Sequence, residues 1–101
     1  MPVTYTCENR DMTALLSGEI DHHGARAMMD TLDRAIGEAL PTRLTLNLSG
    51  VTFMDSSGIA VLIRAKRRMD ELGGSLRAVS IPVQPRRVLD AAGLGRIIPL
   101  E

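Results

Sequence analysis

A strand pattern that leads through a short polar turn into a helix pattern constrains this fold more than any other feature of the chain. Leucines occupy every second position of residues 44–48, as on a half-buried strand. Over residues 59–72 the apolar side chains recur with a period close to 3.6, which predicts an amphipathic helix. Residues 55–58 between them, Asp-Ser-Ser-Gly, suit a helix N-terminus. The sequence therefore predicts a strand–turn–helix unit, the building block of α/β domains.

The segments before this unit predict a hairpin and a helix. Residues 3–7 alternate like an edge strand, residues 9–11 resemble a turn, and residues 14–20 predict a second strand paired with the first. Residues 25–40 place apolar side chains on one helical face. The loop at residues 21–24 joins the second strand to this helix.

The segments after the unit predict one more strand and helix, and a short strand at the end. Gly73 and Gly74 end the long helix, and a strand follows at residues 76–81. Pro85 suits a helix start, and Gly93 suits the end of that helix. Residues 97–100 carry apolar side chains that favour a short last strand.

This order of elements predicts an α/β fold with a mixed sheet of four to five strands flanked by helices, formed by residues 1–101 as a single small domain. Right-handed crossovers make the strands at residues 44–48 and 76–79 parallel. The turn at residues 55–58 then lies at the carboxyl end of the sheet, where α/β folds usually place their functional residues.

Charge and aromatic content argue against a nucleic-acid partner. Lys and Arg total 12, as do Asp and Glu, so the excess positive charge of a phosphate-backbone binder is missing. Tyr5 and Phe53 are the only aromatic residues on which a base could stack.

The cysteine and hydropathy patterns predict a cytoplasmic protein. Cys7 is the only cysteine, so it cannot pair within the chain, and we interpret it as a small apolar strand residue in a reducing compartment. No apolar run approaches the length of a membrane span, and the N-terminus lacks a signal-peptide pattern.

The sequence lacks the motifs that would predict a catalytic site or a metal site. A nucleophile elbow needs glycine two residues before and after its serine, and around Ser56 only Gly58 fits. A phosphate-binding loop would need a lysine after a glycine-rich stretch, and none follows Gly58. His22 and His23 are adjacent without a third spaced ligand, so we expect no metal and no cofactor. The alternative for residues 55–58 is an ordinary helix cap.

Two segments together resemble the hallmark loops of bacterial anti-sigma factor antagonists of the STAS domain family. They are residues 18–23 (Gly-Glu-Ile-Asp-His-His) and residues 53–59 (Phe-Met-Asp-Ser-Ser-Gly-Ile). The resemblance covers essentially the whole chain. One departure is that sporulation-type members continue into a C-terminal helix beyond the position of Glu101.

The resemblance implies a non-enzymatic switch that acts by changing partners. The unphosphorylated form binds an anti-sigma factor, which is itself an ATP-dependent serine kinase, and thereby releases a sigma factor. Phosphorylation ends the interaction, and a serine phosphatase restores it. Ser56 matches the phosphorylated serine, Asp21 matches a loop aspartate implicated in partner contact, and Asp55, Ser57 and Gly58 complete the expected partner-binding surface.

The same family leaves a second class of function open. STAS domains also serve as accessory subunits of transporters and as parts of stress-signalling scaffolds, where they bind partners without phosphorylation. A third hypothesis, a small hydrolase, has the least support because no credible nucleophile–base pair is present.

Overall fold

The computed structural model describes residues 2–101, which form one mixed sheet and three α-helices. The elements follow in the order β1 (Val3–Glu8), β2 (Asp11–Ile20), α1 (Ala25–Ala39), β3 (Arg43–Met54), α2 (Ser56–Glu71), β4 (Ser75–Val79), α3 (Val83–Ala91) and a short 3-10 helix η1 (Leu94–Arg96). The strand order is β1-β2-β3-β4; β1 and β2 are antiparallel, and the other two pairs are parallel. The predicted α/β class, the hairpin and the parallel β3–β4 pair are confirmed.

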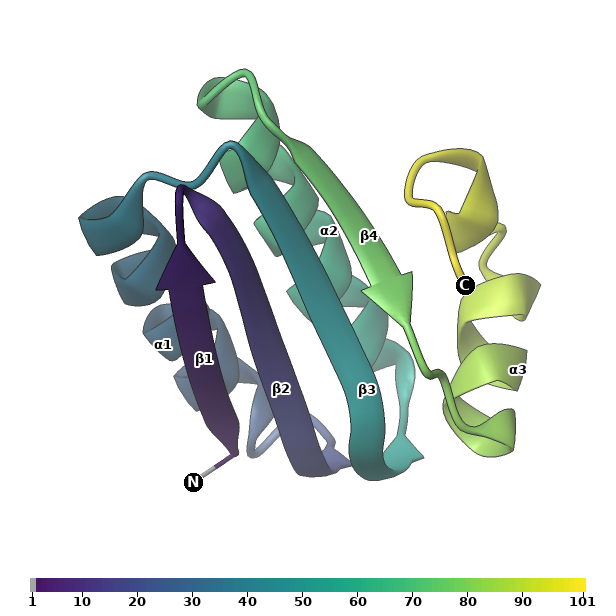
Figure 1. Ribbon diagram of the computed structural model, residues 1–101. Helices are drawn as coiled ribbons and strands as arrows, with labels where there is room; N and C mark the ends of the chain where they lie inside the picture. Colours follow the sequence, from purple (N-terminus) through teal and green to yellow (C-terminus); the bar gives the residue numbers. More distant parts are fainter. Residues whose placement is uncertain (1) are drawn as a thin grey trace.

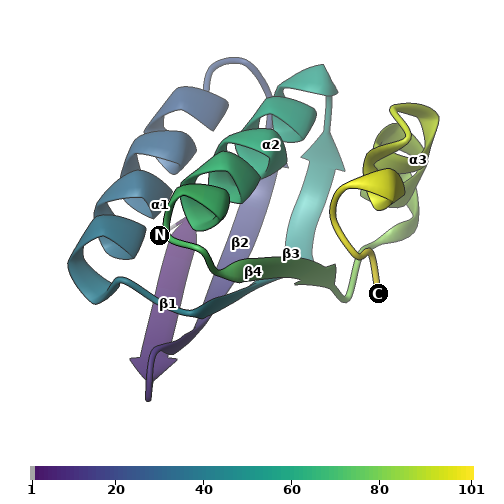
Figure 2. The same ribbon diagram turned by 90° about the horizontal axis from the view of Figure 1, so that it is seen from above.

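Two helices cover one face of the sheet, and the third lies beside it. α1 and α2 run side by side over the same face, whereas α3 and η1 lie beyond β4 (Figures 1 and 2). The opposite face carries exposed residues such as Thr13 and Leu15, and no helix of residues 2–101 covers it. None of these helices is long and apolar enough to cross a membrane.

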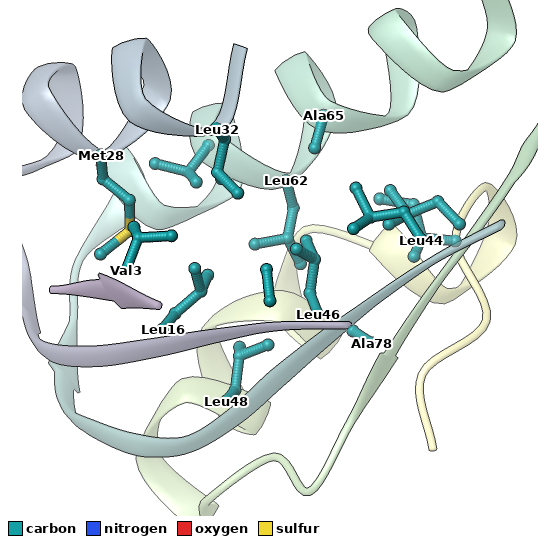
Figure 3. Packing of buried hydrophobic residues seen from close by; sticks show 14 of the residues in the cluster. Val3, Leu16, Met28, Leu32, Leu44, Leu46, Leu48, Leu62, Ala65 and Ala78 are labelled. Atoms are coloured by element: carbon teal, nitrogen blue, oxygen red, sulfur yellow. The ribbon is translucent and has the colours of Figure 1, made fainter. Parts of the chain in front are cut away.

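The hydrophobic core lies between the sheet and the helix pair because alternate strand residues point to that face. The strand register places Met12 beside Leu44 and Leu44 beside Leu76, all of them buried. Figure 3 shows core residues from the strands facing residues from the helices: Leu16, Leu44 and Leu46 against Met28, Leu32 and Leu62. The leucine alternation therefore marked the buried face correctly.

β3 is longer than the strand predicted at residues 44–48. Its pairing with β2 continues past two register shifts, between Leu15 and Ser17 and between Gly18 and Glu19, until Ile20 pairs with Met54. These irregularities interrupt the two-residue period, which is why the apolar pattern alone ended too early.

The last predicted strand is wrong. η1 occupies residues 94–96, the chain then turns at Ile97 and Ile98, and only Leu100 makes a single parallel bridge, to Ala78. Gly93 takes a left-handed conformation with φ of 69° that turns the chain, and Pro99 lacks the N–H group that a ladder needs. The sheet therefore has four strands, which lies within the predicted range of four to five.

α3 also begins earlier than expected. Pro82 is its N-cap residue, and Pro85 lies within its first turn rather than at its start. Proline is tolerated there because the first-turn N–H groups have no partner inside the helix.

Candidate functional site

The two segments singled out in the sequence meet at the carboxyl ends of β2 and β3. Ile20 and Met54, the last residues of these strands, are paired. The Asp55 N–H donates a hydrogen bond of 3.1 Å to the Ile20 carbonyl oxygen. The loop that begins at Asp21 and the turn that begins at Asp55 therefore leave the sheet side by side.

Asp55 is the N-cap residue of α2. One of its carboxylate oxygens accepts a hydrogen bond of 2.7 Å from the Ser57 N–H, and its carbonyl oxygen accepts one of 3.0 Å from the Gly58 N–H. A side-chain cap of this kind is worth about 1 kcal/mol and also gives the dipole a favourable negative charge. Asp55 thus fixes the direction in which the helix, and with it Ser56, begins.

The two serines of the turn differ in exposure. Ser56 is the first residue of α2 and is exposed, and its hydroxyl makes no hydrogen bond within residues 2–101. Ser57 is half-buried and lines a groove between the two helices. The Ser56 hydroxyl is therefore the more accessible of the two to an external enzyme.

Gly58 is buried against the side chain of Met54. A Cβ atom at this position would lie 2.3 Å from Cγ, 2.6 Å from Sδ and 2.8 Å from Cε of Met54. Met54 is itself completely buried, so it has little room to move away. The turn needs glycine here because of this close approach.

Asp21 is held by the backbone of its own loop. One carboxylate oxygen accepts hydrogen bonds from the Gly24 N–H at 2.9 Å and from the His23 N–H at 3.0 Å. The Gly24 bond is the largest influence that lowers the pKa of Asp21 below its ordinary value, because it stabilises the ionised form. A fixed negative charge therefore lies beside the Ser56 turn.

The two histidine rings of this loop lie against each other, with their planes tilted by 37°. The rings of His22 and His23 lie 4.0 Å apart between centroids. Within residues 2–101 no three histidine, cysteine or carboxylate side chains gather in a way that could hold a metal ion.

A groove of about 470 Å³ runs between the N-terminal halves of α1 and α2. Its lining residues are His22, Ala25, Arg26, Met29, Asp30, Ser57, Ala60 and Arg64. Two of these are cationic: Arg26 makes no ion pair among the described side chains, whereas Arg64 binds Asp33 of α1 at 2.7 Å. The groove thus offers positive charge and a half-buried apolar floor next to the turn.

Sequence reasoning missed Gln84, the residue that holds the turn from the other side. Its side-chain amide donates to the Met54 carbonyl oxygen at 2.7 Å and accepts from the Met54 N–H at 2.8 Å. No local pattern marks such a contact, since the two residues are 30 positions apart. Only the placement of α3 next to the end of β3 brings them together.

Comparisons with known proteins agree with this architecture. The STAS domain family model matches residues 4–101. An anti-sigma F factor antagonist of Paenibacillus polymyxa is 33% identical over 85 residues, which cover 84% of this chain and 73% of that protein.

Solved structures show the same fold. The anti-sigma factor antagonist SpoIIAA in its unphosphorylated form aligns with a TM-score of 0.81 at 24% identity, covering 98% of this chain and 87% of that one. SpoIIAA of Bacillus in its phosphorylated form aligns with a TM-score of 0.72 at 24% identity, covering 98% of this chain and 90% of that one. Since the family match spans nearly all the described residues, the chain belongs to the STAS domain family.

Proposed function

We propose that this chain is an anti-sigma factor antagonist controlled by phosphorylation of Ser56. In the unphosphorylated state it binds an anti-sigma factor that is also an ATP-dependent serine kinase, and the sigma factor is released. The names of the Paenibacillus relative and of SpoIIAA support the role of anti-sigma factor antagonist. The existence of SpoIIAA in a phosphorylated and an unphosphorylated form supports control by phosphorylation.

The observation that carries the proposal is the accessibility of the Ser56 hydroxyl. It is exposed, free of hydrogen bonds within residues 2–101, and placed at the first position of a helix capped by Asp55. A kinase can reach this group without unfolding the domain. The helix N-terminus tolerates the added phosphate because unpaired N–H groups and the dipole favour negative charge there.

The proposed partner surface combines the turn, the Asp21 loop and the adjoining groove. Asp21 and Asp55 supply fixed negative charges, whereas Arg26 at the groove supplies an unpaired positive one. Such a mixed polar surface suits a reversible complex whose rim charges set the partner's orientation. A phosphatase that removes the phosphate from Ser56 would restore binding.

The test is phosphorylation of the purified chain. We expect incubation with ATP and the histidine-kinase-like ATPases encoded in the source genome to add one phosphate, located on Ser56 by mass spectrometry. Ser56→Ala should abolish the modification while leaving folding and partner binding intact, and Ser57→Ala is the matched control that should still be modified. Labelling retained in Ser56→Ala and lost in Ser57→Ala would reverse the assignment.

We further propose that the chain performs no catalysis of its own. The purified protein alone should not hydrolyse ATP or a model ester, since no base among residues 2–101 is hydrogen-bonded to Ser56. Turnover that disappears in Ser56→Ala would contradict this part of the proposal. A complex with a permease or a scaffold subunit that forms equally well with Ser56→Asp would instead favour a constitutive STAS subunit.

A further inference from the structure

The side chain of Gln84 replaces a strand partner at the point where β3 runs into the Ser56 turn. β4 ends at Val79, which pairs with Asn47, so β3 continues beyond its neighbour on that side. In a strand the N–H and C=O of one residue point to the same side, and successive residues alternate. Asp55 points its N–H toward β2, so Met54 points its backbone groups away from β2, toward α3.

Gln84 satisfies both of these Met54 groups at once. The Met54 N–H donates to Oε1 at 2.8 Å, and Nε2 donates to the Met54 carbonyl oxygen at 2.7 Å. A primary amide carries one acceptor and one donor in the spacing of a peptide group, so glutamine reproduces the ladder contact that β4 no longer supplies. Because buried backbone groups left unpaired are costly, this contact holds the last residue of β3 in place.

The helix that carries Gln84 is itself fixed to the fold. Pro85 and Leu89, on either side of one helical turn, are buried, and the Arg86 N–H donates to the Pro82 carbonyl oxygen at 2.9 Å. Met54 is therefore clamped between β2 on one side and α3 on the other. Asp55 and Ser56 follow directly, so their position depends on this clamp.

We propose that Gln84 is a positioning residue for phosphoryl transfer to Ser56. The proposal rests on the proposed function. In the transfer, Oγ of Ser56 forms a bond to the γ-phosphorus of ATP, the bond from that phosphorus to ADP breaks, and the hydroxyl proton passes to a base of the kinase. The rate depends on holding Oγ in line with the leaving group, and small displacements cost large factors.

The position of Gln84 predicts which kinetic constant it controls. It contacts the backbone beneath the turn and lies outside the groove residues at the α1–α2 interface. Loss of the two Gln84–Met54 hydrogen bonds should therefore misplace the Ser56 hydroxyl without removing the groove between α1 and α2. We expect kcat for phosphorylation to fall about tenfold or more in Gln84→Ala while KM stays within about twofold.

The experiment measures phosphorylation kinetics of four variants with the kinase that labels the wild-type chain. Gln84→Glu keeps the acceptor for the Met54 N–H but loses the donor, so its kcat should lie between those of wild type and Gln84→Ala. Arg87→Ala is the matched control on α3, an exposed side chain with no partner within residues 2–101. Leu76→Val is a control for general destabilisation, because it changes a buried residue of β4 away from the turn.

A second readout follows the clamp directly. Amide hydrogen exchange at Met54 should accelerate in Gln84→Ala and stay near wild type in Arg87→Ala. Equal kcat values for wild type and Gln84→Ala, or an equal fall in Leu76→Val, would overturn the positioning role and leave the proposed function intact. Failure of every kinase to label the wild-type chain would refute the proposed function, and the positioning role with it.

Discussion

At the scale of single residues, the turn before α2 depends on the missing side chain of Gly58 as much as on the charged side chain of Asp55. Gly58 lies where a methyl group would overlap Met54, and Met54 cannot withdraw because it is completely buried. The backbone of Met54 is in turn clamped by Gln84, so crowding at Gly58 would be transmitted to the turn. At position 58 helix propensity therefore favours alanine, whereas packing against Met54 favours glycine.

Gly58→Ala should lower the stability of the protein by about 1–3 kcal/mol, because overpacking outweighs the better helix propensity of alanine. Urea unfolding followed by circular dichroism measures the difference. Gly37→Ala is the matched control within α1: its new Cβ would meet only the flexible end of Arg68, at 3.3 Å. That variant should be neutral or more stable by up to about 1 kcal/mol. A stable Gly58→Ala protein would show that Met54 can repack.

The residues of the candidate site could be predicted from the sequence only where the signal is local. Asp55 as a helix cap follows from residue type next to a helical period, and the structure confirms it. The exposure of Ser56 relative to Ser57 and the contact of Gln84 with Met54 depend on how distant elements pack. Propensity and periodicity are local signals, so they carry no information about a contact such as that of Gln84 with Met54, which are 30 positions apart.

At the scale of elements, α1 and α2 are joined by charge as well as by the core. Asp33 of α1 lies within 2.7 Å of Arg64 and 3.8 Å of Arg68, both on α2. Arg64 is exposed and Arg68 is half-buried, so this basic face of α2 is partly solvated and also contacts α1. A helical face that looks polar in sequence can still be an interface when the neighbouring helix presents the opposite charge.

Asp33→Ala should destabilise the protein by about 0.5–1 kcal/mol, because two partly exposed arginines lose a shared partner. The difference from wild type, measured by urea unfolding, should shrink in about 1 M salt, where the Debye length is about 3 Å. Asp30→Ala is the control one turn earlier on α1, since Asp30 is exposed and makes no ion pair in the described part of the chain. Equal losses in both variants would argue against the interhelical pair.

The elements themselves show where pattern reading succeeds and where it fails. α1 and α2 were predicted nearly to their ends because each has one apolar face and a clear terminating residue. The length of β3 was not predicted, because bulges break the two-residue period. The parallel pairing of β2 with β3 was not predicted either, because strand pairing joins segments that are far apart in the sequence. The short apolar segment at residues 97–100 resembled a strand, yet it forms a turn after η1, and only Leu100 makes a single bridge to β4.

At the scale of the whole molecule, the candidate site residues lie at one end of the sheet, where β2 and β3 end. The loop before α1 and the turn before α2 lie at the same end of the mixed sheet (Figures 1 and 2), and Ser56 is the exposed first residue of α2. The α/β class followed from the order of elements, and the position of the candidate turn followed from the rule that parallel strands place loops at their carboxyl ends. Which partner covers that end is a matter of surface chemistry that no fold rule specifies.

This arrangement predicts that phosphorylation changes the surface and leaves the fold in place. The Ser56 hydroxyl makes no hydrogen bond that a phosphate would break within residues 2–101, and the helix N-terminus favours the added charge. A partner that closes over a neutral hydroxyl would meet a new negative charge. At about 4 Å from a partner carboxylate and an effective dielectric constant of about 20, the repulsion is about 4 kcal/mol, which weakens binding about a thousandfold.

Ser56→Asp should therefore lose affinity for the anti-sigma partner while its melting temperature and circular dichroism spectrum stay close to those of wild type. Ser75→Asp is the matched control, because it adds the same charge to an exposed serine where β4 begins, at the opposite end of the sheet from the turn. Calorimetric titration should show tight binding for wild type and the control and weak binding for Ser56→Asp. Amide chemical shifts of the phosphorylated protein should change only around the turn. Changes that spread through β1 to β4, or a domain that melts on phosphorylation, would replace this local mechanism with a conformational one.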